Sequence, residues 1–130
     1  MTCPTSLGGV GCDPKNMPIK IVNEFISISD LKTLAQERFG DMVKAVVDLE
    51  TGIMAVGGEL HADEEALLLE QGSKQENLWG FNIYIDQPRE SWLEYDSMIN
   101  IRPSQNNPSR DIQSEEIKNK ITEIVNKLVK

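Results

Sequence analysis

The only histidine of the chain stands in a short segment that is rich in acids. This segment contains Glu59, His61, Asp63, Glu64 and Glu65. His61 and Glu65 are four positions apart, so they can share one face of a helix, and a histidine and a carboxylate at this spacing can hold a divalent metal ion. A transition-metal site usually needs three protein ligands, and the chain has neither a second histidine nor an HExxH pattern. We therefore expect no metal or other cofactor, with His61 and Glu65 as the candidate ligands if a metal does bind.

The same histidine could act as a general base whose tautomer is set by a neighbouring acid. The candidate catalytic residues are then His61, Glu59 and Asp63. No nucleophile is paired with His61 by its spacing, although Ser73 and Ser97 could approach it in the fold. We favour the alternative, in which His61 is a structural residue at a strand–helix junction and the acids face the positive end of a helix dipole.

A second group of polar side chains lies in and beside a loop in the last third of the chain. Arginine side chains bind carboxylates and phosphates through two parallel hydrogen bonds. Because most of the remaining chain is acidic, a small anion would find its most favourable field here. The alternative is a solvated loop whose Asn and Ser residues stabilise turns. The candidate ligand-binding residues are Asn100, Arg102, Ser104, Asn106, Asn107 and Arg110 of this segment, together with Asn82 on the predicted strand at 79–85.

The charge distribution restricts the partners. The formal net charge is -8, and residues 1–101 carry 7 basic and 17 acidic side chains. So negative a surface repels nucleic acid and anionic lipid, because cations supply most of the affinity for phosphate backbones. No apolar run is long enough to cross a bilayer, and no signal-peptide pattern is visible, so we expect a cytoplasmic protein. The partners that remain are a protein partner, a second copy of the chain or a small anionic ligand.

The length of 130 residues fits one domain. Residues 1–16 are rich in Gly, Pro, Thr and Ser, which predicts a flexible arm, and residues 17–130 form a single predicted α+β domain. The two cysteines, Cys3 and Cys12, fall in the arm, and we expect them to be free thiols because a metal site would need two further ligands.

Hydrophobic periodicity and capping signals predict the elements that must position these residues. The predicted order is β-α-β-β-α-β-β-α. Because hairpins link several strands, we expect a mainly antiparallel sheet of about five short strands with three helices packed on one face. The predicted strands are 19–25, 42–49, 53–56, a half-buried strand at 79–85, and one bent or two short strands over 93–101, and the predicted helices start near Ser27, His61 and Ser114.

Two long blocks carry a resemblance to a known family. The blocks GDMVKAVVDLETGIMAVGGELHADEEALLLEQGSKQENLWGFNIY and DSMINIRPSQNNPSR resemble an uncharacterised prokaryotic family, domain of unknown function 5674. The resemblance spans about Met17 to Lys130. It implies membership and no mechanism, because the family has no assigned activity.

Two functional hypotheses remain. The first is a small cytosolic binding or interaction protein without a catalytic cycle, since no nucleophile–base pair, phosphate loop or metal triad is visible. The second is an enzyme or ligand-binding domain for a small anionic molecule, in which the His61 segment faces the Arg102–Arg110 loop across one pocket. A shared concave site for His61 and Arg102 would favour the second hypothesis.

Overall fold

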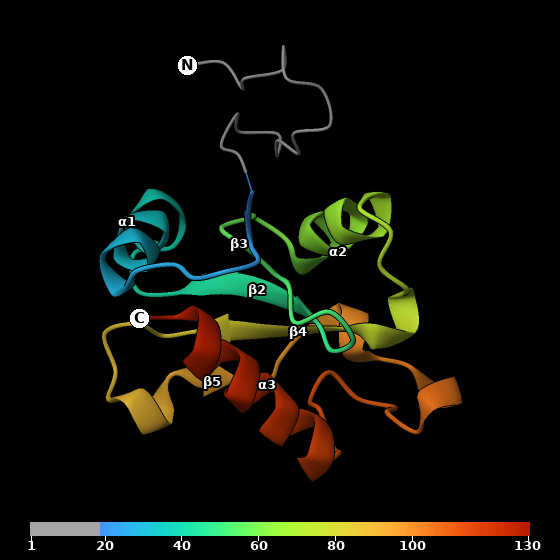
Figure 1. Cartoon of the computed structure of the whole chain (residues 1–130). Helices are drawn as coiled ribbons and strands as arrows, with labels where there is room; N and C mark the ends of the chain where they lie inside the picture. Colours follow the sequence, from blue (N-terminus) through green and yellow to red (C-terminus); the bar gives the residue numbers. More distant parts are fainter. Residues whose placement is uncertain (1–18) are drawn as a thin grey trace.

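A computed structural model describes residues 19–130 (Figure 1). The predicted arm and both cysteines lie outside the described residues. Within them the chain forms three α-helices and five β-strands, joined by loops that contain four short 3-10 turns. The helices are α1 (Ile28–Arg38), α2 (His61–Glu70) and α3 (Glu115–Leu128), and the strands are β1 (Lys20–Val22), β2 (Val43–Asp48), β3 (Met54–Val56), β4 (Leu78–Ile83) and β5 (Leu93–Glu94).

The five strands form one sheet in the order β1-β3-β2-β4-β5, and every neighbouring pair is antiparallel. The predicted α+β class, the order of the elements and the mainly antiparallel sheet are therefore confirmed. The predicted starts of the three helices are also confirmed. The hydroxyls of Ser27 and Ser114 accept hydrogen bonds from first-turn N–H groups of α1 and α3, and Gly40 and Gly72 adopt the left-handed conformation after α1 and α2.

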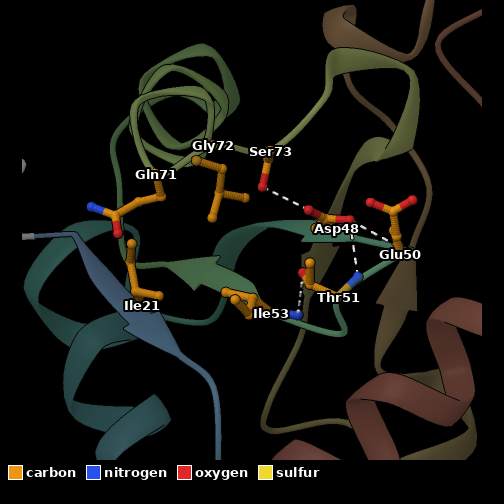
Figure 2. A pocket seen from close by; sticks show the side chains of 9 residues that line it. Ile21, Asp48, Glu50, Thr51, Ile53, Gln71, Gly72 and Ser73 are labelled. Atoms are coloured by element: carbon orange, nitrogen blue, oxygen red, sulfur yellow. Dashed lines mark hydrogen bonds between the residues drawn. The ribbon is translucent and has the colours of Figure 1, made fainter.

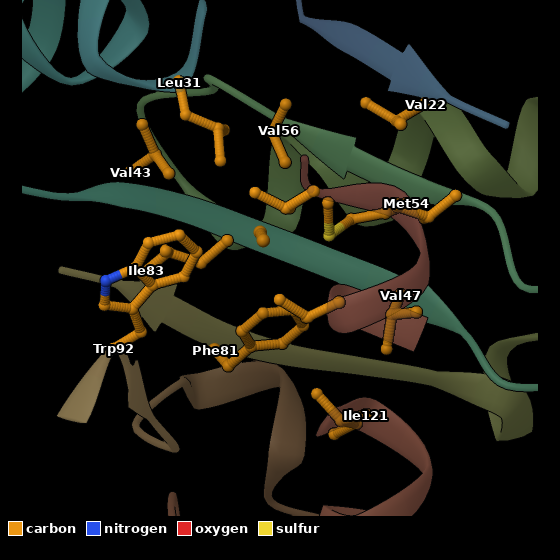
Figure 3. Close-up of a cluster of buried hydrophobic side chains, with 14 of the residues drawn as sticks. Val22, Leu31, Val43, Val47, Met54, Val56, Phe81, Ile83, Trp92 and Ile121 are labelled. Carbon is orange, nitrogen blue, oxygen red and sulfur yellow. The ribbon is translucent and has the colours of Figure 1, made fainter. Parts of the chain in front are cut away.

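The larger hydrophobic core lies on one face of the sheet, under α1 and α3. Leu31 of α1 and Ile121 of α3 are fully buried in it, together with Met54 and Phe81 from the strands. Figure 3 shows these side chains meeting around the central strand. Each such side chain contributes about 1.5–3 kcal/mol to stability when it leaves water, so this face supplies most of the apolar stabilisation.

A smaller core covers the other face, under α2. Leu67 and Leu68 of α2 pack there on Val46, Ala55 and Leu78. In Figure 1, α2 and α3 lie on opposite sides of β2 and β4. The prediction that all three helices pack on one face is therefore wrong, and so is the prediction that the fourth strand is half-buried, since every residue of β4 is buried.

The chain topology explains why α2 lies on the opposite face. α1 connects β1 to β2 across β3, and α2 connects β3 to β4 across β2. The two connections move in the same direction across the sheet but start from strands that run in opposite directions. Connections between parallel strands are almost always right-handed. Two right-handed connections with these starting directions must lie on opposite faces.

No helix within residues 19–130 is long and apolar enough to cross a membrane.

Candidate functional site

A pocket of about 320 Å³ opens beside the start of α2. We call it the His61 pocket. It lies between the N-terminus of α2, the start of β2 and the loop that follows β5. Of the residues named from the sequence, it brings His61, Ser97 and Arg110 together, and Arg102 is not among its lining residues. The lining residues are Lys44, Leu60, His61, Ala62, Ser97, Met98, Ile99 and Arg110.

His61 is the first residue of α2 and is 93% buried, with 7% of its surface exposed. Its Nε2 lies 2.8 Å from the carbonyl oxygen of Phe81. A carbonyl can only accept, so Nε2 carries the proton and Nδ1 presents a lone pair. Burial, with a smaller contribution from the positive charge of Lys44, lowers the pKa of His61 to about 4, although the hydrogen bond to Phe81 acts in the opposite direction. The ring is therefore neutral at physiological pH.

Because His61 lines the pocket and one edge of its ring lies against β4, we infer that the Nδ1 edge faces the pocket. The opposite edge, Nε2 and Cδ2, lies against Phe81 and Gly80 of β4. No residue in the described part of the chain makes a hydrogen bond to Nδ1. Nδ1 of His61 is thus a hydrogen-bond acceptor, because the hydrogen bond between Nε2 and Phe81 fixes the tautomer of the ring.

Gly80 allows His61 and Ser97 to approach the sheet. A Cβ atom at this position would lie 2.8 Å from Ser97 Oγ, 2.9 Å from Ser97 Cβ and 3.2 Å from His61 Cδ2. Both distances to Ser97 are shorter than any normal contact, and Ser97 is buried, so its side chain has little room to move.

We expect Gly80→Ala to lower the free energy of unfolding by about 1–3 kcal/mol, because the methyl group would overpack this contact. Chemical denaturation measures the loss. The double variant Gly80→Ala/Ser97→Gly should recover part of it, and no recovery would show that Ser97 is not the limiting neighbour.

The proposed catalytic residues do not converge. Glu59 lines a separate small pocket with Arg38 and Phe39 at the end of α1, and Asp63 in the first turn of α2 does not line the His61 pocket. Ser97 and the Cδ2 edge of His61 both lie near Gly80, while the Ser97 hydroxyl accepts a hydrogen bond from the N–H of Ile99. The structure therefore shows no base positioned to activate this hydroxyl.

Two cations and a helix N-terminus provide positive potential in the pocket. Lys44 projects from β2, and Arg110 comes from the loop, where its Nε donates to Asp96 over 2.6 Å. Leu60, the N-cap residue of α2, makes no side-chain hydrogen bond to the first turn. The first N–H groups of α2 are thus uncapped by a side chain, and such groups attract anions.

Arg102 has a different environment, although it belongs to the same loop. Its guanidinium is buried and donates to the carbonyl oxygens of Ile99, Gln75 and Leu78 and to the side chain of Gln105. It also lies over the Trp79 ring, 4.5 Å from the centroid. Burial lowers its pKa, yet a guanidinium keeps its charge at neutral pH. Arg102 therefore joins the loop to the segment that leads into β4.

Two asparagines of the loop are also bonded to backbone. Asn100 is buried, and its amide accepts from the N–H of Gly80 and donates to the carbonyl oxygen of the same residue. Asn107 donates to the carbonyl oxygens of Asn100, Ser109 and Asp111 and accepts from the N–H of Gln113. These side chains replace the regular backbone ladder that the loop lacks.

The other ligand-binding candidates lie outside the His61 pocket. Ser104 is exposed, and Asn106 adopts a left-handed conformation at the end of a 3-10 turn. Asn82 of β4 is buried, and its Nδ2 donates to Glu94 over 2.9 Å, whereas its Oδ1 has no hydrogen-bond partner in the part of the chain that the structure describes. A ligand-binding role for these residues remains a prediction.

A second concave site lies where the β2–β3 turn meets the end of α2 (Figure 2). Its volume is only about 120 Å³. Figure 2 shows the Ser73 hydroxyl pointing at Asp48, to which it donates over 2.6 Å. The other carboxylate oxygen of Asp48 accepts from the N–H groups of Glu50 and Thr51. Asp48 already stabilises the turn through these hydrogen bonds. This site is therefore a weaker candidate for ligand binding than the His61 pocket.

The residues described here contain no group of three or more His, Cys, Asp or Glu side chains that could hold a metal ion. Nε2 of His61 is already hydrogen-bonded, which leaves only Nδ1 for a metal ion. Glu65, the other proposed ligand, is half-buried, and its charge raises the pKa of Arg102. A metal ion bound by His61 and Glu65 would thus find no third His, Cys, Asp or Glu ligand among these residues.

Sequence reasoning missed Lys44, which is the cation that projects from the sheet itself. A signal was present, because Lys44 is the one charged residue within the apolar stretch Val43–Val47. Its partner across the antiparallel pair is Asn82, so both side chains point to the face that α2 covers.

The comparisons with known proteins give a family without an activity. No curated protein and no solved structure matches the chain. The model of one family, described as a protein of unknown function (DUF5674), matches residues 20–128. This match covers the sheet, all three helices and the His61 pocket, and the chain belongs to the DUF5674 family.

Proposed function

We propose that the protein binds a small organic anion in the His61 pocket and has no catalytic cycle of its own. The observation that carries the proposal is the convergence of Lys44, Arg110 and the uncapped start of α2 on one cavity of about 320 Å³. This volume is at the lower end of the range for small-molecule sites. A carboxylate or phosphate would there meet two cations and free backbone N–H groups.

The apolar lining supports an organic anion over an inorganic one. Leu60 and Met98 line the pocket and are 55% and 65% exposed, and Ile99 is half-buried beside them. A hydrocarbon part of a ligand would remove these side chains from water at about 25 cal/mol for each Å² of apolar surface. The charged and apolar parts of the pocket together suit an amphipathic small molecule.

The state of His61 supports binding without catalysis. A general base works best when its pKa lies near the operating pH, whereas burial lowers the pKa of His61 to about 4. The cytoplasmic location and the exclusion of nucleic acid remain predictions that rest on the acidic composition.

Calorimetric titration of the full chain at low salt tests the proposal. Inorganic phosphate, glycerol 3-phosphate, lactate and 4-methylpentanoate serve as probes. We expect saturable binding of at least one organic anion, and Lys44→Gln/Arg110→Gln should weaken it about tenfold, because each half-exposed charge is worth up to about 1 kcal/mol.

Lys74→Gln/Lys120→Gln is the matched control, since it also removes two positive charges, from exposed residues that do not line the His61 pocket. Binding to this control should equal binding to the original protein. Absence of binding for every probe, or an equal loss in the control, would refute the proposal.

A further inference from the structure

The polar wall of the His61 pocket holds an unused acceptor beside its positive groups. Nδ1 of His61 has no hydrogen-bond partner in residues 19–130, and the hydrogen bond from Nε2 to Phe81 keeps it in the acceptor form. An anion alone would place its oxygen lone pairs against this nitrogen, which is unfavourable. A ligand that fits must therefore bring a hydrogen-bond donor.

The position of His61 determines where that donor must be. His61 and Ala62 are the first two residues of α2, and both line the pocket. The backbone N–H groups that would receive the anionic group and the ring that needs the donor thus belong to the same turn. A donor on the atom next to the carboxylate carbon would satisfy both at once.

We propose that the pocket recognises a 2-hydroxy or 2-amino carboxylic acid with an apolar side chain. The carboxylate faces the start of α2, Lys44 and Arg110, the 2-hydroxyl or 2-amino group donates to Nδ1 of His61, and the apolar side chain covers Leu60 and Met98. This inference rests on the proposed function and specifies its ligand class.

Asp96 distinguishes the two forms of the ligand. It lies 2.6 Å from Nε of Arg110, and its charge acts on His61, so it stands close to the expected donor. An ammonium group would gain from this negative charge, whereas a hydroxyl group would not. Asp96→Asn should therefore weaken the amino acid and leave the hydroxy acid unchanged or slightly tighter.

Three probes with the same apolar part test the inference by calorimetry on the full chain: 2-hydroxy-4-methylpentanoate, leucine and 4-methylpentanoate. The last one lacks the donor. We expect at least one donor-bearing probe to bind about tenfold or more tightly than 4-methylpentanoate, because a site built for a donor leaves its acceptor unpaired with the analogue. Asp96→Asn then assigns the amine or the hydroxyl.

Nitrogen NMR of the single histidine provides an independent readout. The Nδ1 signal should shift when a donor-bearing probe binds and should move much less with 4-methylpentanoate. Equal affinities with an unmoved Nδ1 signal would overturn this inference and leave the proposed anion site standing. Failure of all three probes, when phosphate or glycerol 3-phosphate binds through Lys44 and Arg110, would overturn the ligand class alone. Failure of every anion would overturn both.

Discussion

Arg102→Ala is expected to lower the free energy of unfolding by about 3–5 kcal/mol, because it removes a buried cation that bonds four protein acceptors. Three of these acceptors are backbone carbonyls, at Ile99, Gln75 and Leu78. Without the guanidinium they would be left unpaired or exposed to water. The stacking contact with Trp79 would be lost as well. Urea denaturation followed by tryptophan fluorescence measures the change.

Arg110→Ala is the matched control, since Arg110 stands in the same loop and forms an exposed ion pair with Asp96. Exposed ion pairs contribute at most about 1 kcal/mol, so this variant should be nearly as stable as the original protein. Arg102→Lys should recover only part of the loss, because an ammonium group cannot reach carbonyls on three sides at once. Equal stability of Arg102→Ala and Arg110→Ala would show that the guanidinium does not hold the loop.

The two arginines also show what the sequence could and could not predict. Both were expected to face an anionic ligand because both lie in one polar loop. Their environments differ because Arg102 reaches residues that are more than twenty positions earlier in the chain. Such long-range partners leave no mark in the local sequence. The strand Val43–Asp48 and the buried apolar face of α3 were predictable, since periodicity and caps are local properties.

The face of the sheet that α2 covers was not predicted, for a related reason. Local pattern indicated a helix with acids in its first turn, and it gave no sign that Glu64, unlike Asp63, turns inward. Glu64 is fully buried, and it accepts from the N–H of Gly58 over 2.8 Å. Burial of a carboxyl group is decided by the topology that places α2 across β2, and the number of apolar residues in the helix does not reveal it.

Two buried titratable groups of α2, His61 and Glu64, should make the free energy of unfolding depend on pH. His61 should lower it as the pH falls, and Glu64 should lower it as the pH rises. His61 has a pKa of about 4 in the folded state, against 6.5 when unfolded, because burial disfavours its charged form. Protons therefore bind the unfolded chain more readily, and stability should fall by about 3 kcal/mol as the pH drops from about 6.5 to about 4. Burial raises the pKa of Glu64 well above 4.5. The contribution of the neutral Glu64 carboxyl to the free energy of unfolding is fully present below pH 4.5 and should decline as the pH rises.

The variants His61→Gln and Glu64→Gln separate these two effects. Urea denaturation at a series of pH values from 4 to 8 gives the free energy of unfolding of each protein. His61→Gln should lose the decline below pH 6.5 and keep the decline at higher pH, because glutamine can still donate to Phe81 but does not titrate. Glu64→Gln should be more stable than the original protein at pH 8, with a gain that disappears near pH 4, because its neutral amide can accept from Gly58 without burying a charge. If both variants kept the pH profile of the original protein, neither buried group would be the origin of the pH dependence. The low pKa of His61, and with it the neutral state of the ring at physiological pH, would then be contradicted.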